Sequence, residues 1–350
     1  MTPLRNNAVN LYNPGREPRS PAEKELYAEV VQGMIHSPEK FLSSKHLYSS
    51  AHAMILYGHV ANHPAYYPTN AEDELLTEKR MEPVLRRLAN GQTWRMVSFG
   101  PGSGNKDLTL LDLMICGKNI PIIYHPVDVC ETACEAVCTM AEEMIKSAGL
   151  LTFDKRSFGK EFISGLRDSN DPEFPRFVYY PGGTFGNFGP GENLEHLKSI
   201  AAELTPADYL LISCDMMCGG KTISMIEDAY RTPPTVEWVM YLLEWLNANL
   251  RTKFSRKDFT YRSNFDRALG GVRTELVANH VIRIDIPGTR KTIFFKKGEA
   301  LRIEISMKYF NHDIRQLFSA AGFTTVEVVE NYKKGWNKYL LRKMIPERGC

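Results

Sequence analysis

Residues 95–128 read RMVSFGPGSGNKDLTLLDLMICGKNIPIIYHPVD, and the rest of the chain is interpreted outward from this segment. An apolar run of strand length ends at Phe99 and is followed at once by a glycine turn, GPGSG, at residues 100–104. Leucines then recur at roughly helical spacing, and a second apolar run covers residues 120–129. The segment therefore predicts a strand, a glycine turn, a helix and a second strand, which is the repeating unit of a parallel α/β sheet.

The glycine turn and the acid after the second strand favour a ligand that contains a nucleoside. Glycine has no Cβ, so the backbone can approach a ligand closely. Asp128 follows Gly104 by about the 20 residues at which an acid holds ribose hydroxyls. The turn has neither the GxGxxG spacing nor the GK[ST] ending of phosphate-binding loops. S-adenosylmethionine, which has ribose and adenine but no phosphate, fits better than a dinucleotide; the alternative is a tight turn with a helix-capping acid.

Length and composition exclude several classes of protein. The chain has 350 residues, enough for one large domain or two modest ones, and its 43% hydrophobic and 11% aromatic residues support a substantial core. A net charge of +2 without a basic run argues against a nucleic-acid-binding surface. We find no repeat period that would indicate a solenoid.

The N-terminal residues 1–20 are polar and interrupted by prolines, which predicts a flexible arm rather than a signal peptide. No run of 18 apolar residues is present, so we expect no membrane span. Seven cysteines without a disulfide-scaffold pattern predict a reduced, cytoplasmic protein. Three of them recur every four residues on one helix face, and we expect buried thiols there rather than a metal site. These cysteines are Cys130, Cys134 and Cys138.

Further strands and helices alternate along the chain and extend the predicted parallel sheet. Strands are expected at residues 93–100, 120–129, 176–180, 209–215, 325–330 and 338–342, with helices at 132–148 and 312–321. Ligands of such sheets lie beyond the carboxyl ends of the strands. Asp128, the GGTFGNF turn (residues 182–188) and Asp215 all fall at that edge, so we expect the site there.

Residues 218–309 interrupt the alternation of strands and helices. A helical stretch over 227–250 is broken at Pro233 and Pro234, and alternating runs with turns at residues 287–288 and 297–298 predict antiparallel strands. We interpret this part as an insertion that forms a second lobe with the N-terminal segment. The predicted division is a substrate-binding lobe of residues 21–85 and 219–310, and a cofactor domain of residues 86–218 and 311–350.

Six short segments together resemble the histidine-specific N-methyltransferase family. The family includes the histidine Nα-methyltransferase of the ergothioneine pathway and the dimethylallyltryptophan N-methyltransferase of ergot alkaloid synthesis. The similarity extends over about residues 48–342. The segments are LYSS (47–50), YYPTNAE (66–72), FGPGSGNKDLTLLDL (99–113), VDV (127–129), GGTFGNF (182–188) with AY (229–230), and RIEISMKY (302–309).

The resemblance implies a class I, Rossmann-like methyltransferase sheet with a second, α+β substrate-binding lobe. It implies an enzyme that uses S-adenosyl-L-methionine to methylate the nitrogen of a small amino-acid or amine substrate, with neither nucleic acid nor membrane as partner. The residues that match the family's cofactor site are Gly100, Gly102, Ser103, Gly104, Lys106 and Asp128.

The same resemblance implies roles for residues that contact the substrate. Asn187 and Tyr230 match the pair that holds the substrate's carboxylate and amine, and Tyr48 and Tyr66 match tyrosines that close the pocket. Tyr48 and Asn187 are the candidate catalytic residues, with Tyr48 relaying a proton. Glu304 and Ser306 match the imidazole-binding pair of the histidine enzymes, and Leu276 stands where those enzymes have Met.

Several residues leave the substrate open between classes of amino acid. The resemblance predicts methylation of the α-amino group of L-histidine, from one to three methyl groups, because the indole-using relatives lack the equivalent of Glu304. Leu276 and Trp238 support the alternative of an indole amino acid or another amine, and Asp154 is the one candidate near the adenine. From the residues alone, Glu304 could instead form a salt bridge with Arg302 or Lys308. A non-catalytic binding protein and a nicotinamide-dependent oxidoreductase are the competing classes of function.

Overall fold

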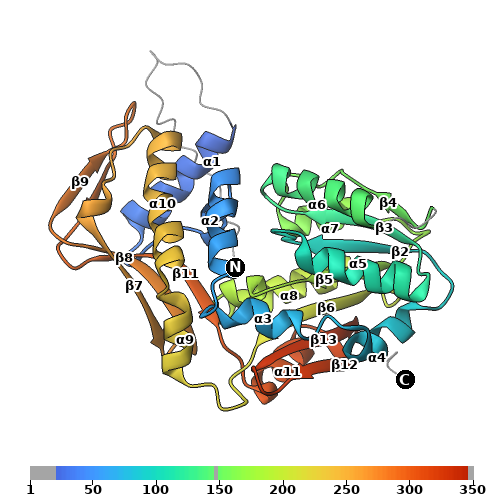
Figure 1. Ribbon diagram of the computed structural model, residues 1–350. Coiled ribbons are helices and arrows are strands. Elements are labelled where there is room, and N and C mark those ends of the chain that lie inside the picture. The colour runs from blue at the N-terminus through green and yellow to red at the C-terminus, as the bar shows by residue number, and fades with distance from the viewer. Residues whose placement is uncertain (1–20, 146–148, 346–350) are drawn as a thin grey trace, which may run out of the picture. The chain divides into compact units, whose positions relative to one another are not determined.

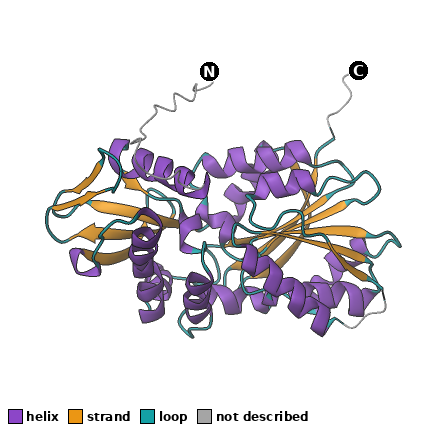
Figure 2. Ribbon diagram, turned by 90° about the horizontal axis from the view of Figure 1, so that it is seen from above, coloured by secondary structure: helices purple, strands orange, loops and turns teal. Residues whose placement is uncertain are grey.

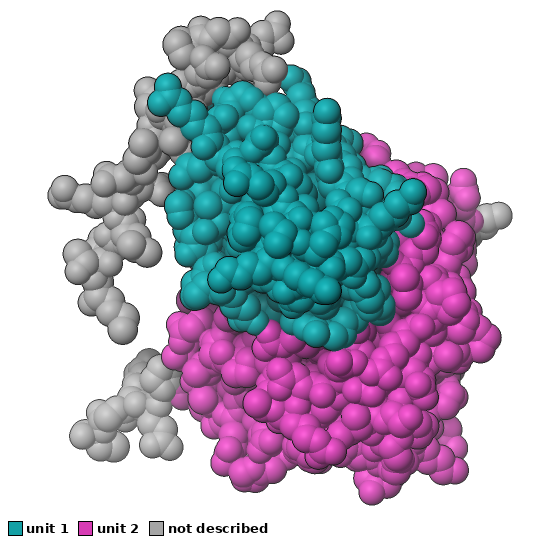
Figure 3. Space-filling model, turned by 90° about the vertical axis from the view of Figure 1, so that its left-hand side faces the viewer, with its two compact units in different colours: residues 1–46, 239–262, 274–304 teal, residues 47–238, 263–273, 305–350 magenta. Residues whose placement is uncertain are grey.

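The computed structural model describes residues 21–145 and 149–345, and its contacts divide the chain into two compact units (Figure 3). Unit 1 contains Met1–His46, Val239–Arg262 and Thr274–Glu304, and unit 2 contains Leu47–Trp238, Ser263–Arg273 and Ile305–Cys350. This division differs from the lobes expected from the sequence, because residues 47–85 and 219–238 belong to unit 2 with the glycine turn. The expected arm, residues 1–20, lies outside the described residues.

Unit 2 is built on a seven-stranded sheet with β2 near its centre (Figure 1). The strand order is β12-β13-β6-β5-β2-β3-β4, and β13 alone runs antiparallel to its neighbours. The predicted parallel α/β sheet is confirmed. The strands are β2 (Trp94–Phe99), β3 (Ile122–Val127), β4 (Leu151–Phe153), β5 (Arg176–Tyr180), β6 (Tyr209–Asp215), β12 (Phe323–Asn331) and β13 (Trp336–Lys343).

Helices cover both faces of this sheet (Figure 2). Successive side chains of a strand point to opposite faces, so Met96 packs with the helices of one face and Val97 with those of the other. All six residues of β2 are buried, as expected of a strand covered on both sides. One face carries α4 (Glu78–Leu88), α5 (Asn105–Lys118) and α6 (Glu131–Met144), and the other carries α7 (Phe162–Asp168), α8 (Glu192–Glu203) and α11 (Asn311–Ala320).

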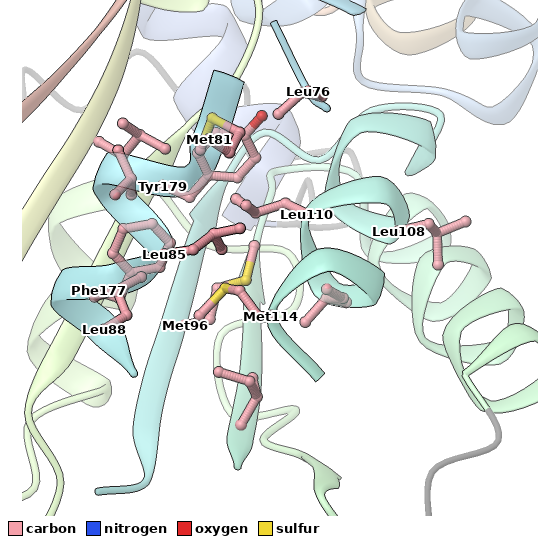
Figure 4. Packing of buried hydrophobic residues seen from close by; sticks show 14 of the residues in the cluster. Leu76, Met81, Leu85, Leu88, Met96, Leu108, Leu110, Met114, Phe177 and Tyr179 are labelled. Atoms are coloured by element: carbon pink, nitrogen blue, oxygen red, sulfur yellow. The ribbon is translucent and has the colours of Figure 1, made fainter. Parts of the chain in front are cut away.

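The larger core cluster lies between the sheet and the layer of α4, α5 and α6. Figure 4 shows Leu85 of α4 and Met114 of α5 pointing toward Met96 of β2. These three side chains are fully buried, and each such side chain contributes roughly 1.5–3 kcal/mol to stability. The packing holds β2 and α5 rigidly on both sides of the glycine turn that joins them.

The remaining helices of unit 2 follow from recognisable start and stop signals. The hydroxyl of Ser50 accepts the Ala53 amide at 3.1 Å and caps α2 (Ala51–Ala61). The expected helical stretch over residues 227–250 is two helices, α9 (Ile223–Tyr230) and α10 (Pro233–Leu250). The break is at the prolines because proline has no backbone N–H and fits best at a helix start. Tyr67–Asp73 forms α3.

Unit 1 contains α1 (Pro21–Val30), a π-helical turn over Val31–His36 and the larger part of α10. It also contains the larger part of a four-stranded sheet in the order β1-β11-β8-β7, whose strands β7, β8 and β11 each continue into unit 2. The expected antiparallel pairing is confirmed for the hairpin of β9 and β10. The pairing expected across the turn at residues 297–298 is wrong, because β10 and β11 belong to different sheets. Neither β1, which pairs parallel with β11, nor β7 was expected from the sequence. The strands are β1 (Lys40–Phe41), β7 (Phe259–Asp266), β8 (Gly271–Ala278), β9 (Ile282–Asp285), β10 (Thr292–Phe295) and β11 (Ala300–Met307).

Throughout the described part of the chain, the helices are too short or too polar to cross a bilayer.

Candidate active site

The glycine turn lies at the carboxyl edge of the sheet, where the strand order changes direction around β2. The neighbours of β2 are β3 on one side and β5 on the other, which makes this edge a topological switch point. The amide of Gly100 donates to the carbonyl of Val127 at 2.8 Å, so the turn starts directly beside the end of β3. Gly100, Gly102 and Gly104 all have positive φ, between 57° and 79°. An L side chain rarely adopts this backbone, so the shape of the turn depends on these glycines.

Close packing and open space alternate around this edge. A Cβ at Gly104 would lie 2.7 Å from Cγ2 of Val137, so Gly104 lets the turn pack tightly on α6. A Cβ at Gly182 or Gly183, after β5, would meet nothing within 4 Å. The backbone therefore has free space beside it at the ends of the central strands, which suits a ligand held against the main chain.

Asp128 lies beside the glycine turn, as its place after β3 predicts. One of its carboxylate oxygens accepts the amide of Cys130 at 2.9 Å, and the carboxylate also accepts the amides of Gly102 and Val129. Burial raises the pKa of Asp128 to about 6, against the lowering effect of these amides. An acid poised near neutrality and fixed to the turn can accept hydrogen bonds from ribose hydroxyls in its ionised form.

Lys106 extends from the first turn of α5 toward Glu72 of α3. Its ammonium lies 3.5 Å from Glu72 Oε2, and about a fifth of its side chain, 22%, is exposed. Burial acts to lower the pKa of Lys106, but Glu72 outweighs it and the pKa is raised. Ser103, within the glycine turn, is exposed. Lys106 is therefore a charged group at the expected cofactor edge and has a fixed carboxylate partner.

Glu72 is a buried carboxylate that the sequence reasoning did not assign, although it ends the YYPTNAE segment. Its oxygens accept the amide of Gly182 at 3.0 Å, the hydroxyl of Ser213 at 2.7 Å and the ammonium of Lys338 at 2.5 Å. Burial acts to raise the pKa of Glu72, but Lys338 and Lys106 lower it to about 2. The available signal was a glutamate at the end of an otherwise uncharged segment.

The GGTFGNF turn follows β5 and brings Asn187 to the same edge. Thr184–Asn187 forms one 3-10 turn, and Asn187 is half-buried. Its side-chain amide forms no hydrogen bond within the described residues. A Cβ at Gly186 would lie 3.3 Å from the backbone N and O of Met307, so this turn packs against the end of β11. Asn187 is therefore held close to that strand end with its amide available for a ligand.

Tyr230, Ser306 and Lys308 form a triangle of hydrogen bonds at the end of β11. The Tyr230 hydroxyl lies 2.8 Å from Ser306 Oγ. The Lys308 ammonium donates to the Tyr230 hydroxyl at 2.9 Å and to Ser306 Oγ at 2.7 Å, and it lies 3.0 Å from Asp215 Oδ2. Two residues for which the resemblance implies separate roles are thus joined directly, and the lysine that joins them was not predicted as a site residue.

Unit 2 also contains two groups of aromatic rings that include the predicted pocket tyrosines. Tyr66 meets Tyr230 edge to face, with ring centroids 5.8 Å apart. Tyr48 packs on Tyr57 and on Trp238, with centroids 5.3 and 5.2 Å apart. The Trp238 indole donates to the Leu47 carbonyl at 3.0 Å. Trp238 therefore fixes the ring of Tyr48, which explains why a large residue occupies this position.

Glu304 and Leu276 belong to unit 1. Glu304 and Ser306 are two residues apart on β11, so their side chains leave the same face of the strand. The ammonium of Lys308 has three N–H donors, and Asp215, Tyr230 and Ser306 use all three. A salt bridge of Glu304 with Lys308, one of the alternatives from the sequence, is therefore disfavoured. Leu276 is fully buried on β8.

Asp154, the one candidate for the adenine, has its carboxylate occupied by basic side chains. It pairs with Arg95 at 2.5 Å, with Arg156 at 2.6 Å and with Nδ1 of His125 at 3.0 Å. Burial acts to raise the pKa of Asp154, and His125 and Arg156 lower it well below its usual range. The carboxylate closes a core ion-pair cluster next to β4, which is a structural role.

Comparison with known proteins shows the family. The model of the histidine-specific, S-adenosylmethionine-dependent methyltransferases matches residues 26–343. The histidine N-alpha-methyltransferase of Mycobacterium tuberculosis is 25% identical over 304 residues, which cover 85% of this chain and 88% of that protein. The L-tryptophan methyltransferase trpM of Psilocybe serbica is 22% identical over 321 residues, covering 85% of this chain and 87% of that protein.

A longer relative matches over only part of its length. Ergothioneine biosynthesis protein 1 of Schizosaccharomyces pombe is 24% identical over 298 residues, which cover 83% of this chain and 37% of that protein. The match of the family model over almost the whole chain agrees with the glycine turn and the acid at the sheet edge. The chain belongs to the histidine-specific methyltransferase family and is an S-adenosylmethionine-dependent methyltransferase.

Proposed function

We propose that this enzyme methylates the α-amino group of a free amino acid, with L-histidine as its substrate and one to three methyl groups transferred. The observation that carries the proposal is the hydrogen bond between Tyr230 and Ser306, on the strand face that also bears Glu304. The groups expected to hold the backbone end and the imidazole of histidine are thereby linked. A carboxylate such as Glu304 accepts an imidazole N–H, and the resemblance implies that the indole-using relatives lack this acid.

The residues at the sheet edge fit the cofactor. The glycine turn and the open space beside Gly182 allow close approach to the main chain, and Asp128 offers an acceptor for ribose hydroxyls. Lys106 supplies a cation for the carboxylate of the methionine part. S-adenosylmethionine supplies an electrophilic methyl group that a neutral amine displaces from sulfur.

The chain's own task in this proposal is placement and proton handling. Well-oriented reactants can gain roughly 7–11 kcal/mol from proximity. An α-amino group has an unperturbed pKa of about 8, so a useful fraction is neutral near pH 7 without a strong base. Asn187 offers its side-chain amide to the substrate, and Tyr48 relays the proton to water. The rings of Tyr48 and Tyr66 favour the quaternary cation that repeated methylation forms.

An indole amino acid is the second candidate. Two large apolar side chains favour it. Leu276 is fully buried, and the Trp238 ring packs on Tyr48 with the centroids 5.2 Å apart. Relatives named for tryptophan and for 4-dimethylallyltryptophan match this chain at similar identity. The candidates are distinguished at Glu304, which matches the imidazole-binding acid of the histidine enzymes and which the indole-using relatives lack.

One experiment tests both candidates. The full chain is incubated with S-adenosylmethionine and a panel of amino acids and amines, and the masses of the products are measured by mass spectrometry. A mass increase of histidine that corresponds to one, two or three added methyl groups supports the proposal. Methylation of tryptophan but not histidine would replace the first candidate with the second.

A cytoplasmic location is part of the proposal. Cys134 and Cys138 are free and buried, and burial raises the pKa of the Cys138 thiol to about 11. Thiols of this kind are typical of proteins from reducing compartments. Fractionation of cells with an antibody to the protein tests the location.

A further inference from the structure

A buried network of charged side chains lies at the end of β6, and the proposed function gives it no role. Asp215 is its centre, and its two oxygens meet different lysines: Lys221 at 2.5 Å and Lys308 at 3.0 Å. The hydroxyl of Tyr67 also donates to Asp215 at 2.6 Å. Both lysine side chains are almost completely inaccessible, at 5% and 0% exposed. Burying two cations with one anion is costly, so such an arrangement indicates a use.

The two lysines differ in what they hold besides Asp215. Lys221 donates its second hydrogen bond to the Gly335 carbonyl at 2.8 Å and packs over the Tyr67 ring. Lys308 instead donates to the hydroxyls of Tyr230 and Ser306. Lys221 therefore binds a backbone carbonyl, whereas Lys308 binds the two hydroxyls that the proposed function assigns to the substrate.

The charge of Lys308 acts on those hydroxyls. Burial acts to lower the pKa of Lys308, but Asp215 outweighs it and the pKa stands above its ordinary value. The ammonium is therefore charged at neutral pH. A hydroxyl that accepts a hydrogen bond from a cation becomes a stronger donor to an anion. The network carries one formal positive charge in excess, two lysines against one aspartate, which favours an anionic group nearby and disfavours a cationic one.

We propose that Lys308 is a positioning residue that makes the enzyme select substrates with an α-carboxylate over the corresponding decarboxylated amines. It does so by donating to both hydroxyls, so that Ser306 donates to Tyr230 and the Tyr230 hydroxyl proton is left for the substrate carboxylate, with a positive charge behind it. The proposal rests on the proposed function, in which Tyr230 contacts the backbone end of the amino acid. Asp215 anchors the ammonium and Lys221 completes the anchor.

The test compares L-histidine with histamine, which has the same imidazole and amine but no carboxylate. Dissociation constants for both compounds are measured by calorimetry on the full chain with S-adenosylhomocysteine present, and kcat/KM is measured for both. We expect Lys308→Met to lower the preference for histidine over histamine roughly 10- to 100-fold, the effect of losing one hydrogen bond to a charged group. The loss should fall on histidine and should appear in KM rather than in kcat.

The matched control is Lys221→Met. It removes an equal charge from the same carboxylate but touches neither hydroxyl. We expect it to leave the preference within about threefold of wild type, the spread of modest electrostatic effects. Equal shifts in the two variants would overturn the proposal, because they would show general electrostatics rather than positioning. An unchanged preference in Lys308→Met would overturn it as well.

The design separates failure of folding and failure of the proposed function from failure of this proposal. Lys308→Met leaves Asp215 paired with Lys221, so the buried network becomes formally neutral and the variant should fold. If its thermal melt shows that it does not, Lys308→Gln replaces it; this variant loses the charge but keeps a donor, so we expect the preference to fall roughly 10-fold, the lower end of the range. Wild type that methylates neither compound would contradict the proposed function, whereas a normal preference that survives both substitutions contradicts the role of Lys308.

Discussion

The carboxylate of Glu72 accepts the amide of Gly182 with both of its oxygens, each at 3.0 Å. This bond joins α3 to the loop that follows β5, across 110 residues of sequence. The same carboxylate accepts the Lys338 ammonium and the Ser213 hydroxyl, and it faces Lys106. A single buried group thus connects the two sides of the carboxyl edge of the sheet with the helix that carries Tyr67.

Glu72→Gln should destabilise unit 2 strongly. The substitution keeps a hydrogen-bond acceptor but leaves Lys338, which is completely buried, without its counter-charge. Breaking one side of a buried pair costs roughly 3–5 kcal/mol. Denaturant unfolding followed by circular dichroism measures the loss.

Two further variants serve as controls for this measurement. Glu74→Gln changes a glutamate in the same segment that pairs with Lys334 at an exposed site, and it should cost less than about 1 kcal/mol. Glu72→Gln combined with Lys338→Met removes the unpaired cation and should recover much of the loss. No recovery in the double variant would contradict the view that the buried charge is the cause.

Lys106→Met should reduce the affinity for the cofactor more than it reduces the stability of the fold. Its ammonium is partly exposed at the edge beside the glycine turn, and a cation there would pair with the carboxylate of S-adenosylmethionine. We expect the dissociation constant for S-adenosylhomocysteine to rise roughly tenfold, the effect of about 1.4 kcal/mol. Calorimetry measures it, with the exposed Lys198→Met as control. A constant unchanged from wild type would remove Lys106 from the cofactor site.

Asp107 predicts a pH dependence of stability. It is fully buried, its carboxylate accepts the Ser98 hydroxyl at 2.7 Å, and burial raises its pKa to about 7. A folded-state pKa above the unfolded value near 3.9 means that the folded protein binds the extra proton. The stabilising contribution is therefore complete below about pH 4 and is lost as pH rises toward 7.

Asp107→Asn should remove this dependence. The asparagine is neutral at all pH values and still accepts the Ser98 hydroxyl. Its free energy of unfolding should exceed that of wild type at pH 8 and approach it at pH 4 to 5. Denaturant titrations of wild type and Asp107→Asn at four pH values measure the difference. If the free energy of unfolding changed with pH equally in both proteins, a group other than Asp107 would be responsible.

The sheet could be predicted from the sequence because its strands are continuous apolar runs. β5 and β6 begin and end at the residues expected, since both are buried along nearly their full length and are bounded by prolines, glycines or polar turns. β4 and β1 were missed because three and two residues, respectively, give no periodicity to recognise. The carboxyl edge was predictable because the glycine turn and Asp128 are close together in sequence.

The buried charge networks could not be predicted in the same way. Lys338 meets Glu72 across 266 residues, and Lys308 meets Asp215 at the end of another strand. Nothing in the local pattern distinguishes these lysines from exposed ones in neighbouring segments. Only the tertiary fold brings these partners together: α3 lies against β13, and the amide of Tyr309, next to Lys308, donates to the Asp215 carbonyl.

Asn187→Ala should raise KM for every α-amino acid substrate. Asn187 is half-buried in the turn after β5. In the proposed function, its side-chain amide binds the backbone end of the amino-acid substrate. We expect KM to rise roughly tenfold or more, the cost of one hydrogen bond to a carboxylate. Steady-state kinetics with histidine measures it. A KM equal to that of wild type would show that the carboxylate binds elsewhere.

Glu304→Ala decides between the two candidate substrates. Glu304 leaves β11 on the same face as Ser306 and is only 8% exposed, so it needs a hydrogen-bond donor. If the donor is a substrate imidazole N–H, the variant should lose roughly 10- to 100-fold in kcat/KM for histidine. Phenylalanine, whose side chain has no N–H donor, should lose little. Glu304→Gln, which keeps the acceptor oxygen without the charge, should retain part of the histidine activity. Equal losses for histidine and phenylalanine in Glu304→Ala would instead assign the carboxylate to the internal structure of unit 1.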